Sequence, residues 1–311
     1  MYDKIVLVTR QTRLEALIQK FNTLGQAKFY IEHSGGDFKR YQQEHEQYQK
    51  AREQLQRALK PLARFQQIER RYLPNFIFGE TDMVVTLGID GLVVNTAKYL
   101  SGQPLIAINP DPAHIDGILL PFTVPQGADA VKQVMQGKAP IQKISMIEAK
   151  LNNGQRLLAF NDLFIGRHDH ISAHYQITYQ GCSEYHSSSG IIVSTGVGAT
   201  GWMSSLFNMA NSMIQAFGDG CSLQAPTLHR TSRQLLFIVR EPFISKTTAA
   251  TLVCGILTEK IGLTVASTMP EGGVIFSDGV LDDFLAFDAG TTVELGLAKQ
   301  KVHLVQKQEA A

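Results

Sequence analysis

The chain has 311 residues, enough for two domains, since a single domain usually takes ~100 to 200 residues. Its 29 lysines and arginines nearly balance its 28 aspartates and glutamates, so no net field favours nucleic acid or an anionic membrane. The apolar run at residues 5–8 is too short for a signal peptide or a membrane span. Cys182, Cys221 and Cys254 are far apart and form no Cys-x-x-Cys pair, which predicts a protein of the reducing cytoplasm.

The N-terminal part of the chain predicts alternating strands and helices. A strand at residues 4–8 is followed by helical periodicity over residues 14–21, which Gly25 is expected to end. Residues 41–72 are polar, with an apolar position every seven residues, and predict two helices, the second beginning at Pro61. We interpret this helix pair as a solvated cover over a sheet, with a dimer seam or a lid as the alternative.

Short apolar runs predict the strands of the fold. Residues 83–87 and 105–108, separated by a helix-like stretch, are typical of buried parallel strands joined by a crossover. After residue 140, alternating runs predict a β-rich region that one helix at residues 200–217 interrupts. The expected strands of that region are residues 143–150, 155–160, 173–179, 190–195, 234–239, 261–266 and 273–276.

The first candidate site is the loop Gly88-Ile89-Asp90-Gly91, which follows a buried strand and precedes a helix. Ligands of open α/β sheets lie at the carboxyl ends of strands, and a helix N-terminus offers free N–H groups to phosphate. Asp90 could accept a proton from an attacking hydroxyl, or help to hold a metal-bound phosphate. An Asp-Gly turn or a helix cap is the plain alternative.

Two further candidate sites follow. The Gly-rich residues 196–201 match the Gly-x-Gly-x-x-Gly pattern, but Asp219 lies in a turn rather than at the end of a second strand, so we favour another kind of ligand loop. The pair Asn161-Asp162 could fork onto sugar hydroxyls or a base edge, or form a turn. The histidines at residues 168–174 have no further ligand at a recognisable spacing, so no metal site is predicted.

Taken in order, these segments resemble the motifs of the NAD kinase family. The family's Gly-Gly-Asp-Gly loop is similar to residues 88–91, its Asn-Glu pair to Asn161-Asp162, and its Ser-Thr-rich loop to residues 194–202. Their order and spacing agree, and the resemblance covers roughly residues 83–280. Three ordered motifs are more specific than any one of them.

The resemblance also implies a domain organisation. An α/β domain at residues 1–135 would carry the phosphate loop, and a β-rich, β-sandwich-like domain at residues 136–287 would bind NAD. A tail at residues 288–311 would return to the first domain, with the active site between the domains and a homo-oligomer as the assembly. Residues 109–112 and 161–166 are more similar to the mitochondrial-type branch of the family.

The activity that the resemblance implies is the transfer of the γ-phosphate of ATP, with Mg²⁺, to the 2′-hydroxyl of the adenosine ribose of NAD, giving NADP. Asp90 would be the general base, and Gly88 and Gly91 would approach the donor phosphates. Expected partners are thus a dinucleotide and a nucleoside triphosphate, with no nucleic acid and no membrane. The NAD site would be formed by Asn161, Asp162, Ser189, Thr195, Gly198, Thr200 and Trp202.

Two residues depart from the family's loop. Ile89 replaces a glycine, which can adopt positive φ and lets a backbone N–H approach phosphate closely, and Leu92 replaces a threonine. Two other hypotheses therefore stay open: a sensor that binds NAD or NADP without kinase activity, and a kinase for another small hydroxyl acceptor such as a sugar or lipid. The donor is open between ATP and polyphosphate.

Overall fold

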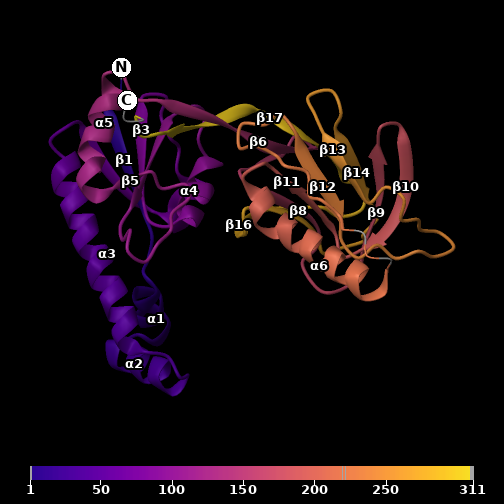
Figure 1. The fold of residues 1–311 in the computed structure, drawn as a ribbon, viewed down its shortest axis with the longest axis horizontal. Helices are drawn as coiled ribbons and strands as arrows, with labels where there is room; N and C mark the ends of the chain where they lie inside the picture. The colour runs from indigo at the N-terminus through magenta and orange to yellow at the C-terminus, as the bar shows by residue number, and fades with distance from the viewer. Residues whose placement is uncertain (1, 219, 221, 309–311) are drawn as a thin grey trace. The chain divides into compact units, whose positions relative to one another are not determined.

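The computed structural model describes residues 2–218, 220 and 222–308 and divides the chain into two units (Figure 1). Unit 1 comprises Met1–Gln142 and Val302–Ala311, and unit 2 comprises Lys143–Lys301. Asp219, Cys221 and the end of the expected tail at residues 309–311 lie outside the described residues. No helix in the described part of the chain is both long and apolar enough to span a membrane.

A parallel sheet forms the centre of unit 1, with the order β17-β4-β3-β1-β2. The inner strands β3 and β4 are buried along their whole length, as expected of parallel strands covered on both faces. The C-terminal segment reaches this sheet, because His303 and Leu304 of β17 pair with β4. The strands are β1 (Lys4–Thr9), β2 (Arg64–Glu69), β3 (Asp82–Leu87), β4 (Pro104–Asn109), the short β5 (Phe122–Thr123) and β17 (Thr292–Val305).

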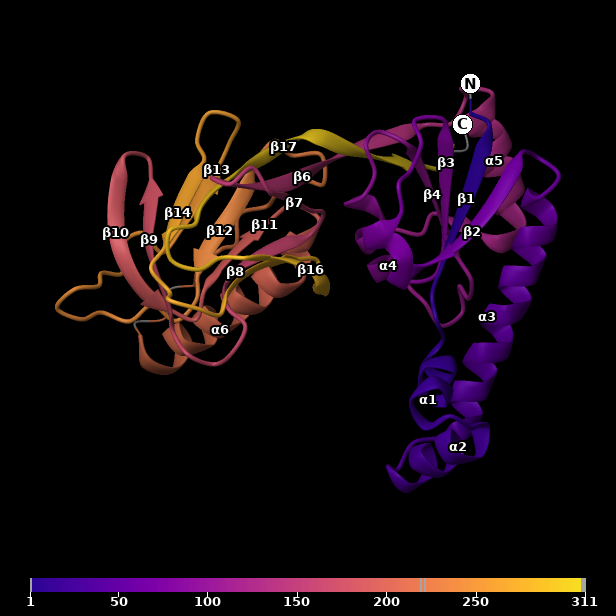
Figure 2. The ribbon, with the colours of Figure 1, turned by 180° about the vertical axis from the view of Figure 1, so that it is seen from behind.

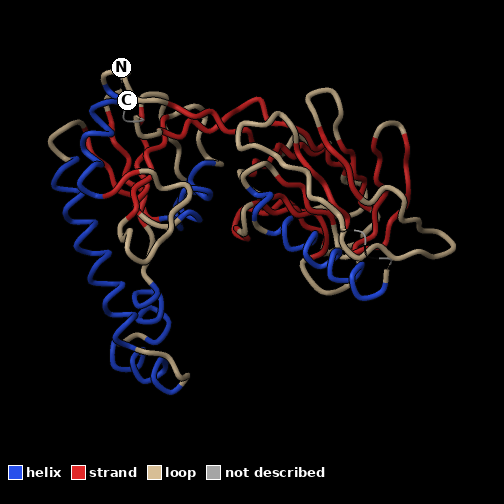
Figure 3. Tube along the Cα trace, viewed as in Figure 1, coloured by secondary structure: helices blue, strands red, loops and turns tan. Residues whose placement is uncertain are grey.

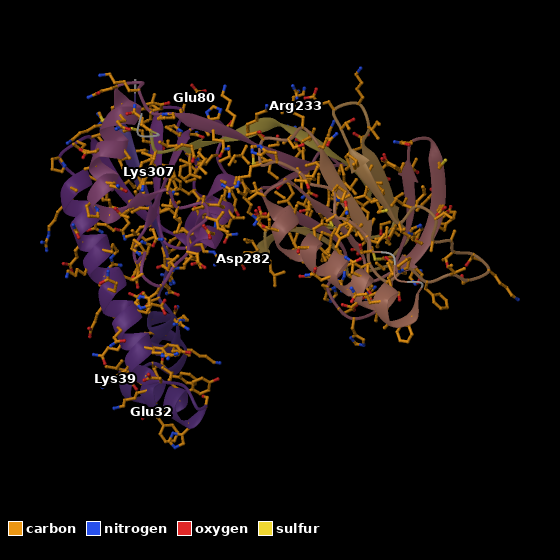
Figure 4. The ribbon with its side chains drawn as sticks, viewed as in Figure 1. Glu32, Lys39, Glu80, Arg233, Asp282 and Lys307 are labelled. Carbon is orange, nitrogen blue, oxygen red and sulfur yellow. The ribbon has the colours of Figure 1, made fainter. Side chains whose placement is uncertain are left out.

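Helices cover both faces of this sheet (Figures 1 and 2). The helices α3 (Phe38–Leu59) and α5 (Gly127–Met135) pack on one face, and α4 (Asp90–Ala97) lies on the other. Tyr48 and Leu55 of α3 are buried in the core, so α3 covers the sheet, as interpreted from the sequence. Beyond the sheet, α3 continues toward α1 (Arg13–Phe21) and α2 (Leu24–His33), where Figure 4 labels Glu32 and Lys39.

Two local predictions in unit 1 are wrong. The first helix ends at Asn22, which adopts φ 65°, and Gly25 lies instead in the first turn of α2, whose N-terminus Thr23 caps. Pro61 begins no second helix, because residues 64–69 pair with β1 along six residues as the edge strand β2 (Figure 3). Backbone pairing with a preformed neighbour outweighs the weak helical preference of this polar segment.

Unit 2 is a sandwich of two antiparallel sheets around one apolar core. One sheet contains β10-β9-β14-β17 and the β6-β7 hairpin, and the other has the order β13-β12-β11-β8-β15-β16. The helix α6 (Trp202–Phe217) packs on the outer face of the six-stranded sheet through Met203 and Phe207. The strands are β6 (Ile141–Leu151), β7 (Arg156–Ala159), β8 (Asp162–Arg167), β9 (Ala173–Tyr179), β10 (Cys182–Ser188), β11 (Ile191–Ser194), β12 (Leu235–Val239), β13 (Cys254–Leu257), β14 (Leu263–Ser267), β15 (Gly273–Ser277) and β16 (Val280–Ala286).

The predicted fold class, an α/β N-terminal region followed by a β-rich region, is therefore confirmed. Each strand expected in the β-rich region is present within a few residues of its predicted ends. The sequence did not predict β8, β10, β13, β16 and β17.

We expect Tyr48→Phe to destabilise unit 1 by about 1 to 3 kcal/mol. The Tyr48 hydroxyl donates to the Leu87 carbonyl at 2.9 Å and accepts the Arg10 backbone N–H at 3.0 Å, and phenylalanine leaves both buried groups unpaired. Urea unfolding followed by circular dichroism measures the change, with the exposed Tyr72→Phe as the matched control. Equal stability of the two variants would contradict this role.

Candidate functional site

The loop predicted to bind phosphate lies at the carboxyl end of β3, where α4 begins at Asp90. Gly88 is packed closely, since a Cβ there would lie 2.8 Å from Leu92 Cδ2. Gly91 differs, because an added Cβ would meet no atom of the described residues within 4 Å. The first turn of α4 therefore has room for a ligand at Gly91, at a helix N-terminus whose backbone N–H groups point outward, although that of Leu92 donates to the Ile89 carbonyl at 2.9 Å.

Ile89 fits this loop without backbone strain. Its φ is −102° and its ψ is 169°, which is extended backbone that any residue adopts. The argument from positive φ therefore does not apply to this isoleucine. Leu92 is 2% exposed and packs in the core, so its side chain does not take part in the surface of the loop. Both departures from the family pattern are compatible with the local fold.

Asp90 is half-buried and held in place by one hydrogen bond. Its Oδ1 accepts the backbone N–H of Leu119 at 2.8 Å, which ties α4 to the segment that follows β4. An acid in the first turn is also favoured by the partial positive charge at a helix N-terminus. This arrangement orients the carboxylate, as a general base requires.

In unit 2, strand pairing brings two predicted segments together. In the antiparallel ladder of β8 and β11, Asp162 lies opposite Ser194. Beyond the ladder, the Thr195 backbone N–H donates to the Asn161 carbonyl at 2.9 Å, and the Thr195 hydroxyl donates to the Phe160 carbonyl at 2.7 Å. The Asn-Asp pair and the start of the Ser-Thr-rich loop therefore form one cluster, which we call the Asn161 cluster (Asn161, Asp162, Ser194, Thr195 and Gly198).

The Asn161 cluster contains buried acceptors that the protein leaves unsatisfied. Asn161 Oδ1 and Asp162 Oδ1 are both buried and have no hydrogen-bond partner among the described residues. Burial raises the pKa of Asp162 to about 7, a hydrogen bond with Ser194 opposes the rise, and the nearby Asp278 carboxylate adds to it. A ligand that donates hydrogen bonds, such as a sugar with free hydroxyls, would satisfy these atoms.

Asp278 contacts this cluster, and the sequence did not single it out as a site residue. Its carboxylate accepts the backbone N–H groups of Phe160 at 2.9 Å, Asn161 at 2.7 Å and Asp162 at 3.3 Å. It follows β15 with a φ of 55°. Asp278 thus fixes the backbone that carries the Asn-Asp pair. The only signal in the sequence was the turn pair Asp278-Gly279.

The glycines of the Ser-Thr-rich loop are explained by close backbone packing. A Cβ at Gly196 would lie 2.2 Å from the His229 carbonyl oxygen, and one at Gly198 would lie 2.4 Å from that of Asn161. The preceding strand β11 is antiparallel to both of its neighbours, so no β-α-β unit surrounds the loop. Thr200 is exposed, and its hydroxyl donates to the Val197 carbonyl at 3.3 Å.

Two remaining candidates lie apart from the Asn161 cluster. The Trp202 ring stacks on Phe164, with centroids 5.8 Å apart, and the Arg240 guanidinium lies 5.5 Å from the Trp202 ring centroid. Ser189 precedes β11, and its backbone N–H donates to the Arg240 carbonyl at 3.0 Å. Ser189 and Thr195 are therefore beyond opposite ends of β11.

Metal ligands do not gather in the described part of the chain, where no three His, Cys, Asp or Glu side chains form a group that could hold an ion. The His168 ring is instead bonded to the Gly272 carbonyl oxygen at 2.9 Å.

The fold is that of two solved structures. The NAD kinase from Archaeoglobus fulgidus in complex with ATP aligns over 98% of this chain and 94% of its own, with a TM-score of 0.59 and 14% identity. The yeast NADH kinase complexed with NADH aligns over 99% of this chain and 85% of its own, with a TM-score of 0.58 and 15% identity. No protein-family model matches the chain.

Curated relatives match part of the sequence. The NAD kinase of Thiobacillus denitrificans is 35% identical over 94 residues, 28% of this chain and 31% of the relative. The NAD kinase of Chlorobium luteolum is 30% identical over 130 residues, 40% of this chain and 44% of the relative. The match thus spans less than half of each relative's length. The chain is thus similar to NAD kinases in sequence over less than half of its length and in fold over nearly all of it. Asp90 and the Asn161 cluster lie in the segments whose sequence resembles the motifs of those kinases.

The raised pKa of Asp162 predicts a pH-dependent stability. The folded state binds the proton more tightly than the unfolded chain, whose Asp titrates near 3.8, so the free energy of unfolding falls as the pH rises from 4 to about 7. Asp162→Asn removes this slope, so the variant should be more stable than wild type at pH 8 by about 1 kcal/mol or more, and similar at pH 4.

Thermal unfolding at both pH values measures this difference. The exposed Asp282→Asn in β16 is the control and should shift the melting temperature little at either pH. A difference between wild type and Asp162→Asn that is the same at pH 4 and pH 8 would show that Asp162 does not bind a proton in this range.

Proposed function

We propose that this protein transfers the γ-phosphate of ATP to the 2′-hydroxyl of the adenosine ribose of NAD, giving NADP. The observation that carries the proposal is the pair of buried acceptors, Asn161 Oδ1 and Asp162 Oδ1, at the position of the family's dinucleotide motif. Two solved proteins of this fold, one bound to ATP and one to NADH, support it.

On the dinucleotide side, the two acceptors would receive hydrogen bonds from ribose hydroxyls or from the amino group of a base. A hydrogen bond to the Asp162 carboxylate also favours its charged form, so ligand binding would lower the raised pKa. Arg240, which follows β12, lies beside the Trp202 ring at the start of α6, and its guanidinium provides a positive charge that suits a phosphate of the dinucleotide.

On the donor side, Asp90 would accept the proton of the attacking hydroxyl. Its carboxylate is oriented by Leu119 and stands at the N-terminus of α4, beside the open position at Gly91. Asp90 is also the carboxylate of this loop that would reach Mg²⁺, which neutralises charge on the donor phosphates when bound. Positioning of the two substrates supplies the rest of the rate enhancement.

The other hypotheses are not favoured by the structure. A sensor without kinase activity was suggested by Ile89 and Leu92 in the phosphate loop, and the extended backbone of Ile89 removes the reason that concerns positive φ. A kinase for a different acceptor does not account for the Asn161 cluster.

Asp90→Asn should lower NADP formation at least ~100-fold, because the amide cannot accept the proton. The fold should persist, since asparagine still accepts the Leu119 N–H through its Oδ1. Purified protein is assayed with NAD, ATP and Mg²⁺, coupled to an NADP-specific dehydrogenase, with NAD binding followed by calorimetry.

The exposed Asp129→Asn in α5 is the control and should retain the wild-type rate. An Asp90→Asn protein as fast as wild type would remove Asp90 from the role of base. Wild-type protein that binds NAD but forms no NADP would contradict the proposed reaction.

A further inference from the structure

A cavity of about 1270 Å³ lies in unit 1 where β1, β3 and β4 end. The turn after β1 and the helix α3 form one wall, and Ile89 and the segment after β4 form the other. Its position at the carboxyl ends of parallel strands is where α/β folds bind ligands. None of the predicted site residues lines this cavity, although Ile89 belongs to the phosphate loop.

Two arginines of this cavity share a single carboxylate. Arg10 Nη2 lies 3.1 Å from Glu44 Oε1, and Arg13 Nε lies 2.6 Å from Glu44 Oε2. The Glu44 carboxylate thus bridges two guanidinium groups, that of Arg10 in the turn after β1 and that of Arg13 at the start of α1. Phosphate oxygens are bound in the same way, because guanidinium groups present donors in a fork that fits either anion.

Arg10 is held rigidly and still has an unused donor. Its backbone N–H and its side chain both contact Tyr48, with the guanidinium 5.0 Å from the Tyr48 ring centroid. The Arg10 side chain is only 16% exposed, and its Nε is buried without a hydrogen-bond partner among the described residues. A buried cation with an unsatisfied donor is favourable only where an anion can approach it.

The cavity is lined by further charged side chains besides Arg10, Arg13 and Glu44. Arg40 and Lys50 also line it, which makes cations more numerous than carboxylates. Glu46, on the same helix as Glu44, lines the same cavity, but its carboxylate accepts a hydrogen bond from the Gln42 amide at 2.8 Å and bridges no two arginines among the described residues. Glu44 is therefore distinguished from Glu46 by its bridge to Arg10 and Arg13.

We propose that Arg10 and Arg13 bind the triphosphate chain of the phosphate donor, and that Glu44 occupies this position until the donor replaces it. The chemistry recognised is a chain of phosphates, which ATP and inorganic polyphosphate share. Glu44 neutralises the two arginines in the free protein and discriminates against singly charged anions, which do not compete with a bridging carboxylate. The inference rests on the proposed kinase function and assigns its donor site.

Calorimetry with inorganic tripolyphosphate and, separately, with ATP and Mg²⁺ tests the site in the 311-residue chain. Glu44→Gln should tighten tripolyphosphate binding about tenfold, because the placeholder no longer competes. Glu46→Gln changes the same charge in the same helix and cavity and should tighten binding less than about twofold. Arg13→Gln should weaken binding about tenfold, and its side chain is 61% exposed, so the fold should tolerate the change.

If Glu44→Gln and Glu46→Gln change the affinity for tripolyphosphate equally, the proposed role of Glu44 is overturned, because the change would then reflect only the net charge of the cavity. Absence of binding by both probes would overturn the site. Binding of both probes supports a site that recognises the phosphate chain alone. If the protein binds ATP but not tripolyphosphate, the nucleoside is also required, and recognition by the phosphate chain itself is overturned.

The inference and the proposed function can fail separately. If both variants form NADP with an unchanged KM for ATP, the proposed kinase activity stands and this binding site is overturned. If tripolyphosphate binding is tighter in Glu44→Gln and weaker in Arg13→Gln, but the protein forms no NADP, the site stands and the proposed kinase activity is overturned.

Discussion

The antiparallel register of β8 and β11 is the constraint on which the site in unit 2 depends. It sets Asp162 opposite Ser194 and leaves Asn161 beside Thr195, just beyond the end of the ladder. A slip of one residue would turn every side chain of β8 to the other face of the sheet. The buried Leu163 and Ile165 on the inner face prevent this slip, so the apolar core of the sandwich determines where the polar cluster lies.

The Asn161 cluster also lowers the stability of unit 2, because it contains buried polar atoms without hydrogen-bond partners among the described residues. Three backbone N–H groups converge on Asp278, while two side-chain oxygens next to them are buried without partners. A core free of ligand would normally satisfy such atoms. The raised pKa of Asp162 has the same cause, because burial disfavours the charged carboxylate until a hydrogen-bond donor reaches it. Preformed, unsatisfied acceptors of this kind are able to bind a ligand that donates hydrogen bonds.

In unit 1, the parallel sheet concentrates the chemistry at one edge. Arg10, Asp90 and the segment after β4 come from distant parts of the sequence, yet all three follow the carboxyl ends of neighbouring strands. The Tyr48 hydroxyl joins two of these ends, since it bonds to both Arg10 and Leu87. The helix α3 therefore contributes to the cavity as well as to the core, which its polar composition did not indicate.

The sequence by itself determined the fold class, the order of the motifs and the buried strands β3 and β4, because apolar periodicity and turn residues act over a few neighbours. Tertiary structure alone decided that residues 64–69 are a strand, because a polar edge segment takes its structure from the partner it pairs with. It also decided the extended backbone at Ile89. Two further contacts join residues far apart in the chain, which no local sequence pattern encodes. Asp278 binds the backbone of residues 160–162, and Glu44 pairs with Arg10.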